Sequence, residues 1–63
     1  MPIIQVNLLE GRSDEQVEAM IREVTDAVSI TLDAPRESIR IIVNAVSSAH
    51  WGIGGATAKS KGR

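Results

Sequence analysis

An α/β fold is predicted for this chain: a single βαβ unit with two parallel strands, followed by a short hairpin. Three observations predict it. A short strand-like run opens the chain, a long segment of helical periodicity follows, and a β-branched run comes next. Elements in this order place the two strands parallel, joined by a right-handed crossover. We expect all of residues 1–63 to form one domain.

The first strand and the helix have clear boundaries in the sequence. Residues 3–9 are mostly apolar with two interleaved polar residues, which is typical of a strand, and a turn with Gly11 follows. Ser13 is a good N-cap, and Gln16 completes a capping box. Apolar residues then recur at helical spacing to Leu32, while charged residues fall between them. The helix is therefore predicted over about residues 14–32, ended by the segment Asp33-Ala34-Pro35.

The second strand is predicted over residues 39–46, where β-branched residues dominate and only Arg40 and Asn44 are polar. A strand that is apolar on both faces is buried on both. One face can take the helix, and the other needs a second subunit. In the Gly-rich tail, residues 51–55 predict a short turn or hairpin that docks by Trp51 and Ile53.

The small size of the chain also points to self-association. A domain of 63 residues buries too little surface for a secure core, and such folds usually add disulfides, a metal or partner subunits. With no Cys and one His, the sequence excludes disulfides and a Cys/His zinc site. Partner subunits remain.

Charge is divided unevenly along the chain. The first 37 residues carry eight acidic and three basic groups, and the remainder carries four basic groups and no acid. An acid-free half can hold an anionic ligand, although a solvated basic tail is the simpler reading of Lys59, Lys61 and Arg63. The tail lacks interleaved aromatics, so nucleic-acid binding is not expected. No leader and no apolar stretch long enough to cross a membrane is visible, so a cytoplasmic protein is expected.

Parallel pairing of the two strands determines where Pro2, Arg40 and Arg12 lie relative to one another. Pro2 opens the first strand and Arg40 lies near the start of the second, so both belong to one end of the sheet. Arg12 follows the far end of the first strand. Seven strand residues span about 23 Å, which no Arg side chain covers. If Arg12 and Pro2 share a site, Arg12 must come from another chain.

Each of these residues also has a chemical and a structural interpretation. Removal of Met1 exposes the secondary amine of Pro2, a base poised near neutral pH, whereas structurally Pro2 simply opens an edge strand. Arg40 is either a fork for a substrate carboxylate or the partner of an acid such as Glu37 or Glu10. Arg12 is either an anion-binding group near a helix start or an exposed loop residue. Trp51, the only aromatic residue, is a core or interface anchor, a site wall, or both.

Taken together, these residues resemble the 4-oxalocrotonate tautomerase family. The resemblance covers nearly the whole chain, and its most specific parts are Pro2 after Met1, residues 9–16 (LEGRSDEQ), residues 32–35 (LDAP), Arg40, and residues 52–55 (GIGG). It implies a homohexamer of βαβ subunits, a trimer of dimers with sheets running between subunits. The site would lie between subunits, with Pro2 from one chain and both arginines from neighbours.

The resemblance also implies a reaction and the residues that serve it. It is the conversion of 2-hydroxymuconate, a dienol, to 2-oxo-3-hexenedioate, an isomerisation of aromatic hydrocarbon catabolism without metal or cofactor. Pro2 would transfer the proton and Arg40 would stabilise the developing enolate charge as the second catalytic residue. Arg12 would hold the distal carboxylate of a small dicarboxylate or 2-oxo acid. Leu9, Trp51 and Ile53 would line the substrate site.

The chain departs from the family pattern at one of these positions. The aromatic wall is usually Phe, and Trp51 is bulkier. Relatives that dehalogenate haloacrylates add a carboxylate or a further Arg where this chain has Ile53 and Leu9, so that activity is not expected. Every expected group is present in the one chain, which favours a homo-oligomer. The alternative function is a non-catalytic oligomeric subunit or a small-anion binder that retains Met1.

Overall fold

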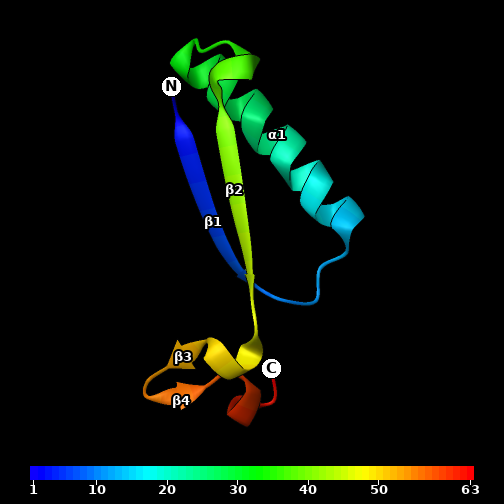
Figure 1. Ribbon diagram of the computed structural model, residues 1–63, viewed down its shortest axis with the longest axis vertical. Helices are drawn as coiled ribbons and strands as arrows, with labels where there is room; N and C mark the ends of the chain where they lie inside the picture. Colours follow the sequence, from blue (N-terminus) through cyan, green and yellow to red (C-terminus); the bar gives the residue numbers. More distant parts are fainter.

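Two parallel strands form the sheet of the βαβ unit. The computed structural model describes all 63 residues. Strand β1 (Ile3–Leu9) pairs with β2 (Arg40–Val46) in a register that runs from Ile3 opposite Arg40 to Leu9 opposite Val46. The predicted parallel pairing is confirmed (Figure 1).

Strand β2 begins one residue later than predicted. The amide of Ile39 donates to the carbonyl of Arg36 at 3.1 Å, which closes a 3-10 helix, Arg36–Ser38, that the sequence pattern did not predict. Ile39 is therefore the cap of that turn and not the first strand residue. It is also one of only two buried residues in the chain, with 7% of its surface exposed.

Helix α1 (Asp14–Leu32) has the predicted bounds and the predicted start. The Ser13 hydroxyl accepts from the Gln16 amide at 3.1 Å, and the Gln16 side chain accepts from the Ser13 amide at 3.1 Å, so the capping box is confirmed. At the other end Asp33 takes a left-handed conformation with φ of 52°, and the next amide, that of Ala34, donates to the Ser29 carbonyl. The left-handed turn at Asp33 therefore ends α1 together with Pro35.

The two faces of the sheet differ in exposure. On one face alternate residues of β1 are half-buried beneath α1, together with partners on β2: Ile4, Val6, Leu8, Ile41 and Val43. The opposite face carries Ile3, Gln5 and Asn7 of β1, all exposed, and Ile42 of β2, which is 45% exposed. Asn44 donates to the side chain of Asn7 across this face at 3.2 Å. The face predicted to need a second subunit is thus uncovered in the single chain.

The apolar stripe of α1 is half-buried where it faces the sheet, as predicted, at Val17, Met20, Ile21, Val24 and Val28. The prediction was wrong for Leu32, the last residue of α1, which is 63% exposed, and Ile30 is 81% exposed. Asp26, one of the charged residues between the apolar positions of α1, is half-buried and forms an ion pair with Arg36. This pair is the only salt bridge in the chain.

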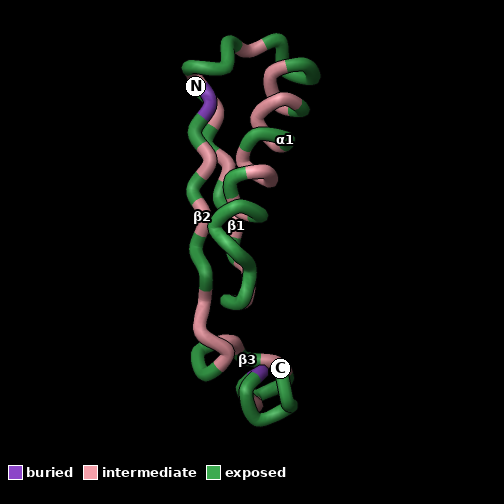
Figure 2. The backbone as a smooth tube through the Cα atoms, turned by 90° about the vertical axis from the view of Figure 1, so that its right-hand side faces the viewer, coloured by how far each residue is buried: buried purple, intermediate pink, exposed green.

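The C-terminal residues form a module of their own, residues 47–63. It contains the 3-10 helix Ser48–His50, the hairpin of β3 (Gly52–Ile53) and β4 (Ala56–Thr57), and the 3-10 helix Lys59–Lys61. The predicted hairpin is confirmed, with Gly54 and Gly55 at positive φ in its turn. The two 3-10 helices were not predicted. Trp51 and Ile53 are half-buried within this C-terminal module, which stands off the far end of the sheet (Figures 1 and 2).

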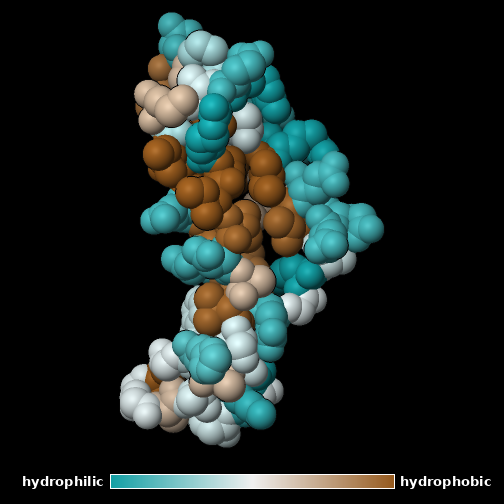
Figure 3. Space-filling view, viewed as in Figure 1, coloured by the Kyte–Doolittle hydropathy of each residue, from teal (hydrophilic) through white to brown (hydrophobic).

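A single chain leaves much apolar surface uncovered. Its radius of gyration is 14.6 Å, against about 11 Å for a compact domain of this length. Its accessible surface is 4675 Å², against about 4,000 Å² for a compact monomer of this mass. Hydrophobic side chains gather over the strands and the adjoining side of α1 (Figure 3). No helix combines the length and the apolar character needed to cross a membrane.

Candidate active site

Pro2 and Arg40 lie side by side at the end of the sheet where both strands begin. The Arg40 amide donates to the Pro2 carbonyl at 3.0 Å, one step before the first strand pair. Pro2 is half-buried and Arg40 is exposed. The predicted neighbourhood of these two residues in one chain is therefore confirmed.

The Arg40 guanidinium has no carboxylate partner. Its Nη1 donates to the Glu37 carbonyl at 2.5 Å and, more weakly, to the Ile39 carbonyl at 3.4 Å. The alternative of a salt bridge to Glu37 or Glu10 is therefore wrong for this chain. The backbone carbonyls orient one nitrogen of the fork. Its other N–H groups make no hydrogen bond within the chain, and a guanidinium can bind a planar carboxylate in two-point fashion.

The other four predicted site residues lie at the opposite end of the sheet. Leu9 ends β1, Arg12 follows in the turn before α1, and Trp51 and Ile53 belong to the C-terminal module. The Glu10 amide donates to the Val46 carbonyl at 2.9 Å, which ties the turn to the end of β2. Both segments thus leave the sheet at the same place (Figure 1).

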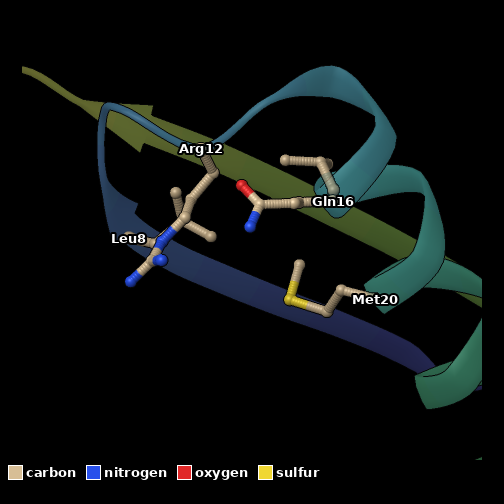
Figure 4. Close-up of a pocket in the computed structure, with 5 residues that line it drawn as sticks. Leu8, Arg12, Gln16 and Met20 are labelled. Atoms are coloured by element: carbon tan, nitrogen blue, oxygen red, sulfur yellow. The ribbon is translucent and has the colours of Figure 1, made fainter.

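Arg12 also lines a hollow of about 250 Å³ between β1 and the start of α1. The hollow is lined by Leu8, Arg12, Gln16, Val17 and Met20. In Figure 4 the guanidinium of Arg12 extends over Leu8, with Gln16 and Met20 on the helix side. Arg12 is the only predicted site residue in it.

Leu8, not Leu9, is the strand residue that meets Arg12 in this hollow. Alternation along β1 places Leu8 on the helix face with Val6, and Leu9 on the opposite face with Asn7. The period of two was visible in the sequence and could have identified Leu8. Gln16, which caps α1, also forms a polar edge of the hollow. Met20, from the apolar stripe of α1, forms an apolar edge.

The two groups of residues cannot meet within one chain. Strand β1, seven residues long, runs from the end that holds Pro2 and Arg40 to Leu9, a span of about 23 Å at the usual rise per residue. The distance applies to Trp51 and Ile53 too, because the C-terminal module follows the end of β2. If Pro2 shares a site with Leu9, Trp51 and Ile53, these residues must come from another chain. No group of three or more His, Asp or Glu side chains is placed to hold a metal ion.

Nearly the whole chain matches a known protein family. The family described as "Tautomerase enzyme" matches residues 2–61, nearly the whole chain. The chain belongs to the tautomerase family. The family expected from the sequence is thereby confirmed, and so are its isomerase class and its βαβ fold.

Individual members of the tautomerase family resemble this chain over its full length. A 2-hydroxymuconate tautomerase of Stutzerimonas stutzeri is 56% identical over 63 residues, which is 100% of both chains. The structure of a 4-oxalocrotonate tautomerase isozyme from Methylibium petroleiphilum is 44% identical with a TM-score of 0.92, covering 98% of this chain and 100% of that one. A heterohexameric 4-oxalocrotonate tautomerase from Chloroflexus aurantiacus is 32% identical with a TM-score of 0.88, covering 94% and 95%.

Proposed function

We propose that this tautomerase converts 2-hydroxymuconate to 2-oxo-3-hexenedioate, without metal or cofactor, through the amino-terminal amine of Pro2. The observation that carries the proposal is the 56% identity to a 2-hydroxymuconate tautomerase over the whole of both chains. An Arg adjacent to Pro2, with a guanidinium free of acidic partners, supports the same chemistry.

Proton transfer is the task of the Pro2 amine. Once Met1 is removed, the neutral secondary amine accepts a proton from the dienol and returns one to the far carbon of the conjugated system. Met1 is 80% exposed and lies outside β1, so the bond between Met1 and Pro2 is accessible to a processing enzyme. Its removal breaks no strand pairing, because the ladder begins at Ile3.

The two arginines have separate tasks in this proposal. Arg40 binds the carboxylate and oxygen next to the reacting carbon and stabilises the enolate charge that develops there. Arg12 of another chain holds the distal carboxylate. Leu9, Trp51 and Ile53 form apolar walls that exclude water, which strengthens both ion pairs.

The assembly that brings these groups together is proposed to be a homohexamer, a trimer of dimers. The separation of Pro2 from Arg12 requires more than one chain. The extended shape and the uncovered sheet face supply apolar surface for the contacts. The Chloroflexus relative is a hexamer, although it is built from two kinds of chain, and this supports a number of six subunits.

Mass spectrometry of the protein purified without an N-terminal tag tests the proposal, combined with turnover of 2-hydroxymuconate. We expect a chain that begins at Pro2 and is active. A variant that retains Met1, made by placing a bulky residue between Met1 and Pro2, should keep the oligomer and lose turnover. Full activity of a sample shown to retain Met1 would falsify the mechanism and favour the alternative, a non-catalytic subunit or small-anion binder.

A further inference from the structure

Three cationic residues follow one buried residue, Ala58, within five positions of the C-terminal module. Ala58 is fully buried, with 0% of its surface exposed. Its carbonyl accepts from the amides of Lys61 and Arg63, both at 3.0 Å, and Lys59 follows it in the chain. The cationic side chains of Lys59, Lys61 and Arg63 are all exposed. These backbone bonds hold the three residues that carry the cations within one short turn next to Ala58.

The same residue ties these cations to the proposed site wall. The Ala58 amide donates to the Trp51 carbonyl at 2.7 Å, so Trp51 and the cationic turn share a single hydrogen-bonded frame. The turn is fixed further by Ser60, whose amide and hydroxyl bond to Thr57 at 3.1 and 2.7 Å. If Trp51 of one chain lies against the Pro2 amine of another, the cationic turn therefore lies near that amine too.

No acidic side chain forms an ion pair with this cluster. The C-terminal module contains no acidic residue, and the only salt bridge joins Arg36 to Asp26 elsewhere. All eight acidic side chains lie between Glu10 and Glu37, on α1 and its flanking turns. A solvated tail accounts for the exposure of the cations but not for their shared attachment to the frame that carries Trp51.

We propose that Lys59, Lys61 and Arg63 form a cationic rim that draws doubly charged dicarboxylates to the site and selects them over monocarboxylates. The inference rests on the proposed function, which supplies a dianionic substrate. The rim acts through long-range attraction and touches no reacting atom. It therefore raises kcat/KM and leaves kcat unchanged, and its effect declines as salt screens it.

The magnitude follows from Coulomb attraction. For a dianion about 10 Å from two unit charges in water, at low ionic strength, removing both charges lowers kcat/KM about five- to tenfold. A monoanion feels half the interaction, so the loss is about two- to threefold. At about 1 M salt the Debye length shrinks to about 3 Å and both losses disappear.

The test compares the double variant Lys59→Gln/Lys61→Gln with wild type on a dicarboxylate and a monocarboxylate 2-hydroxydienoate, from low to high salt. Arg22→Gln on the exposed surface of α1 is the matched control for a lost positive charge, and Lys59→Arg/Lys61→Arg keeps the charge. We expect the stated losses only in the glutamine variant, converging with wild type at high salt. The rim would be overturned by a loss of kcat/KM that is equal for both substrates or independent of salt. A loss that also occurs in Arg22→Gln or in the arginine variant would overturn it too.

Binding without turnover separates this inference from the proposed function. Calorimetry with adipate, a saturated dicarboxylate, should show a salt-dependent loss of affinity in the glutamine variant, and hexanoate a smaller one. A wild-type protein that turns over neither dienol would overturn the proposed function, whereas the adipate measurement still decides whether the rim exists. Adipate binding that is equal in wild type and variant would overturn it.

Discussion

The backbone amide of Arg40 donates a hydrogen bond to the carbonyl of Pro2, at 3.0 Å. This bond lies just before Ile3 and Arg40, the first pair of the parallel ladder. Backbone atoms alone thus hold Pro2, the proposed base, beside Arg40, the proposed stabiliser of charge. Substitution of the Arg40 side chain should therefore change the chemistry and leave the strand pairing intact.

Loss of either arginine should affect different kinetic constants. Arg40→Ala removes a donor that acts on charge developing in the transition state, so kcat should fall about a hundredfold. Arg12→Ala removes binding of the distal carboxylate, so KM should rise about tenfold with little change in kcat. Steady-state kinetics on a dicarboxylate dienol checks both, with Arg22→Ala as the control. On a monocarboxylate, which has no distal group, Arg12→Ala should change KM very little. Equal effects of the two variants on that substrate would contradict the separate tasks of the two arginines.

The pH dependence of turnover should report the Pro2 amine. The neutral amine is the base, so kcat/KM should rise with pH as the ammonium form loses its proton and level off above the pKa. The positive Arg40 nearby disfavours the ammonium form, so that pKa should lie below the value of about 7.7–8.0 of an ordinary α-amine. A pH-rate profile of the processed protein checks this. A profile flat across that region would rule out the amine as the base.

Self-association should persist at micromolar concentration. The uncovered sheet face and the exposed Ile30 and Leu32 make a lone chain a poor folding unit. Sedimentation velocity should give about 41 kDa, six times the 6.8 kDa chain, and dilution should cause dissociation and unfolding together. A folded monomer that is stable on dilution would refute the proposed assembly.

The capping box at the start of α1 should contribute measurably to stability. Ser13→Ala leaves the Gln16 amide without its hydroxyl partner and should lower the free energy of unfolding by about 1 kcal/mol. Ser13→Thr keeps the acceptor oxygen and serves as the matched control. Urea unfolding must use one protomer concentration for all variants, because dissociation is coupled to unfolding. Equal midpoints for the two variants would show that the cap is not used.

Sequence patterns determined the elements of this protein because the physical causes are local. Apolar spacing, the Ser13–Gln16 box and the break at Pro35 act within a few residues, and they give the bounds of β1 and α1 as the structure has them. The start of β2 was one residue off because the 3-10 turn at Arg36–Ser38 has no strong sequence signal. Parallel topology, in turn, predicted that Pro2 and Arg40 share one end and that Arg12 does not.

Only the tertiary structure decided how the remaining side chains are grouped. Trp51 and Ile53 lie at the end of the sheet far from Pro2, because the C-terminal module stands off the end of β2 (Figure 1). Arg40 bonds to carbonyls and not to an acid, and the amides of Lys61 and Arg63 both bond to the Ala58 carbonyl. Both arrangements depend on backbone dihedrals that composition does not encode. Local patterns fix where an element begins and ends, whereas the direction in which a turn sends the chain is set by contacts between residues distant in sequence.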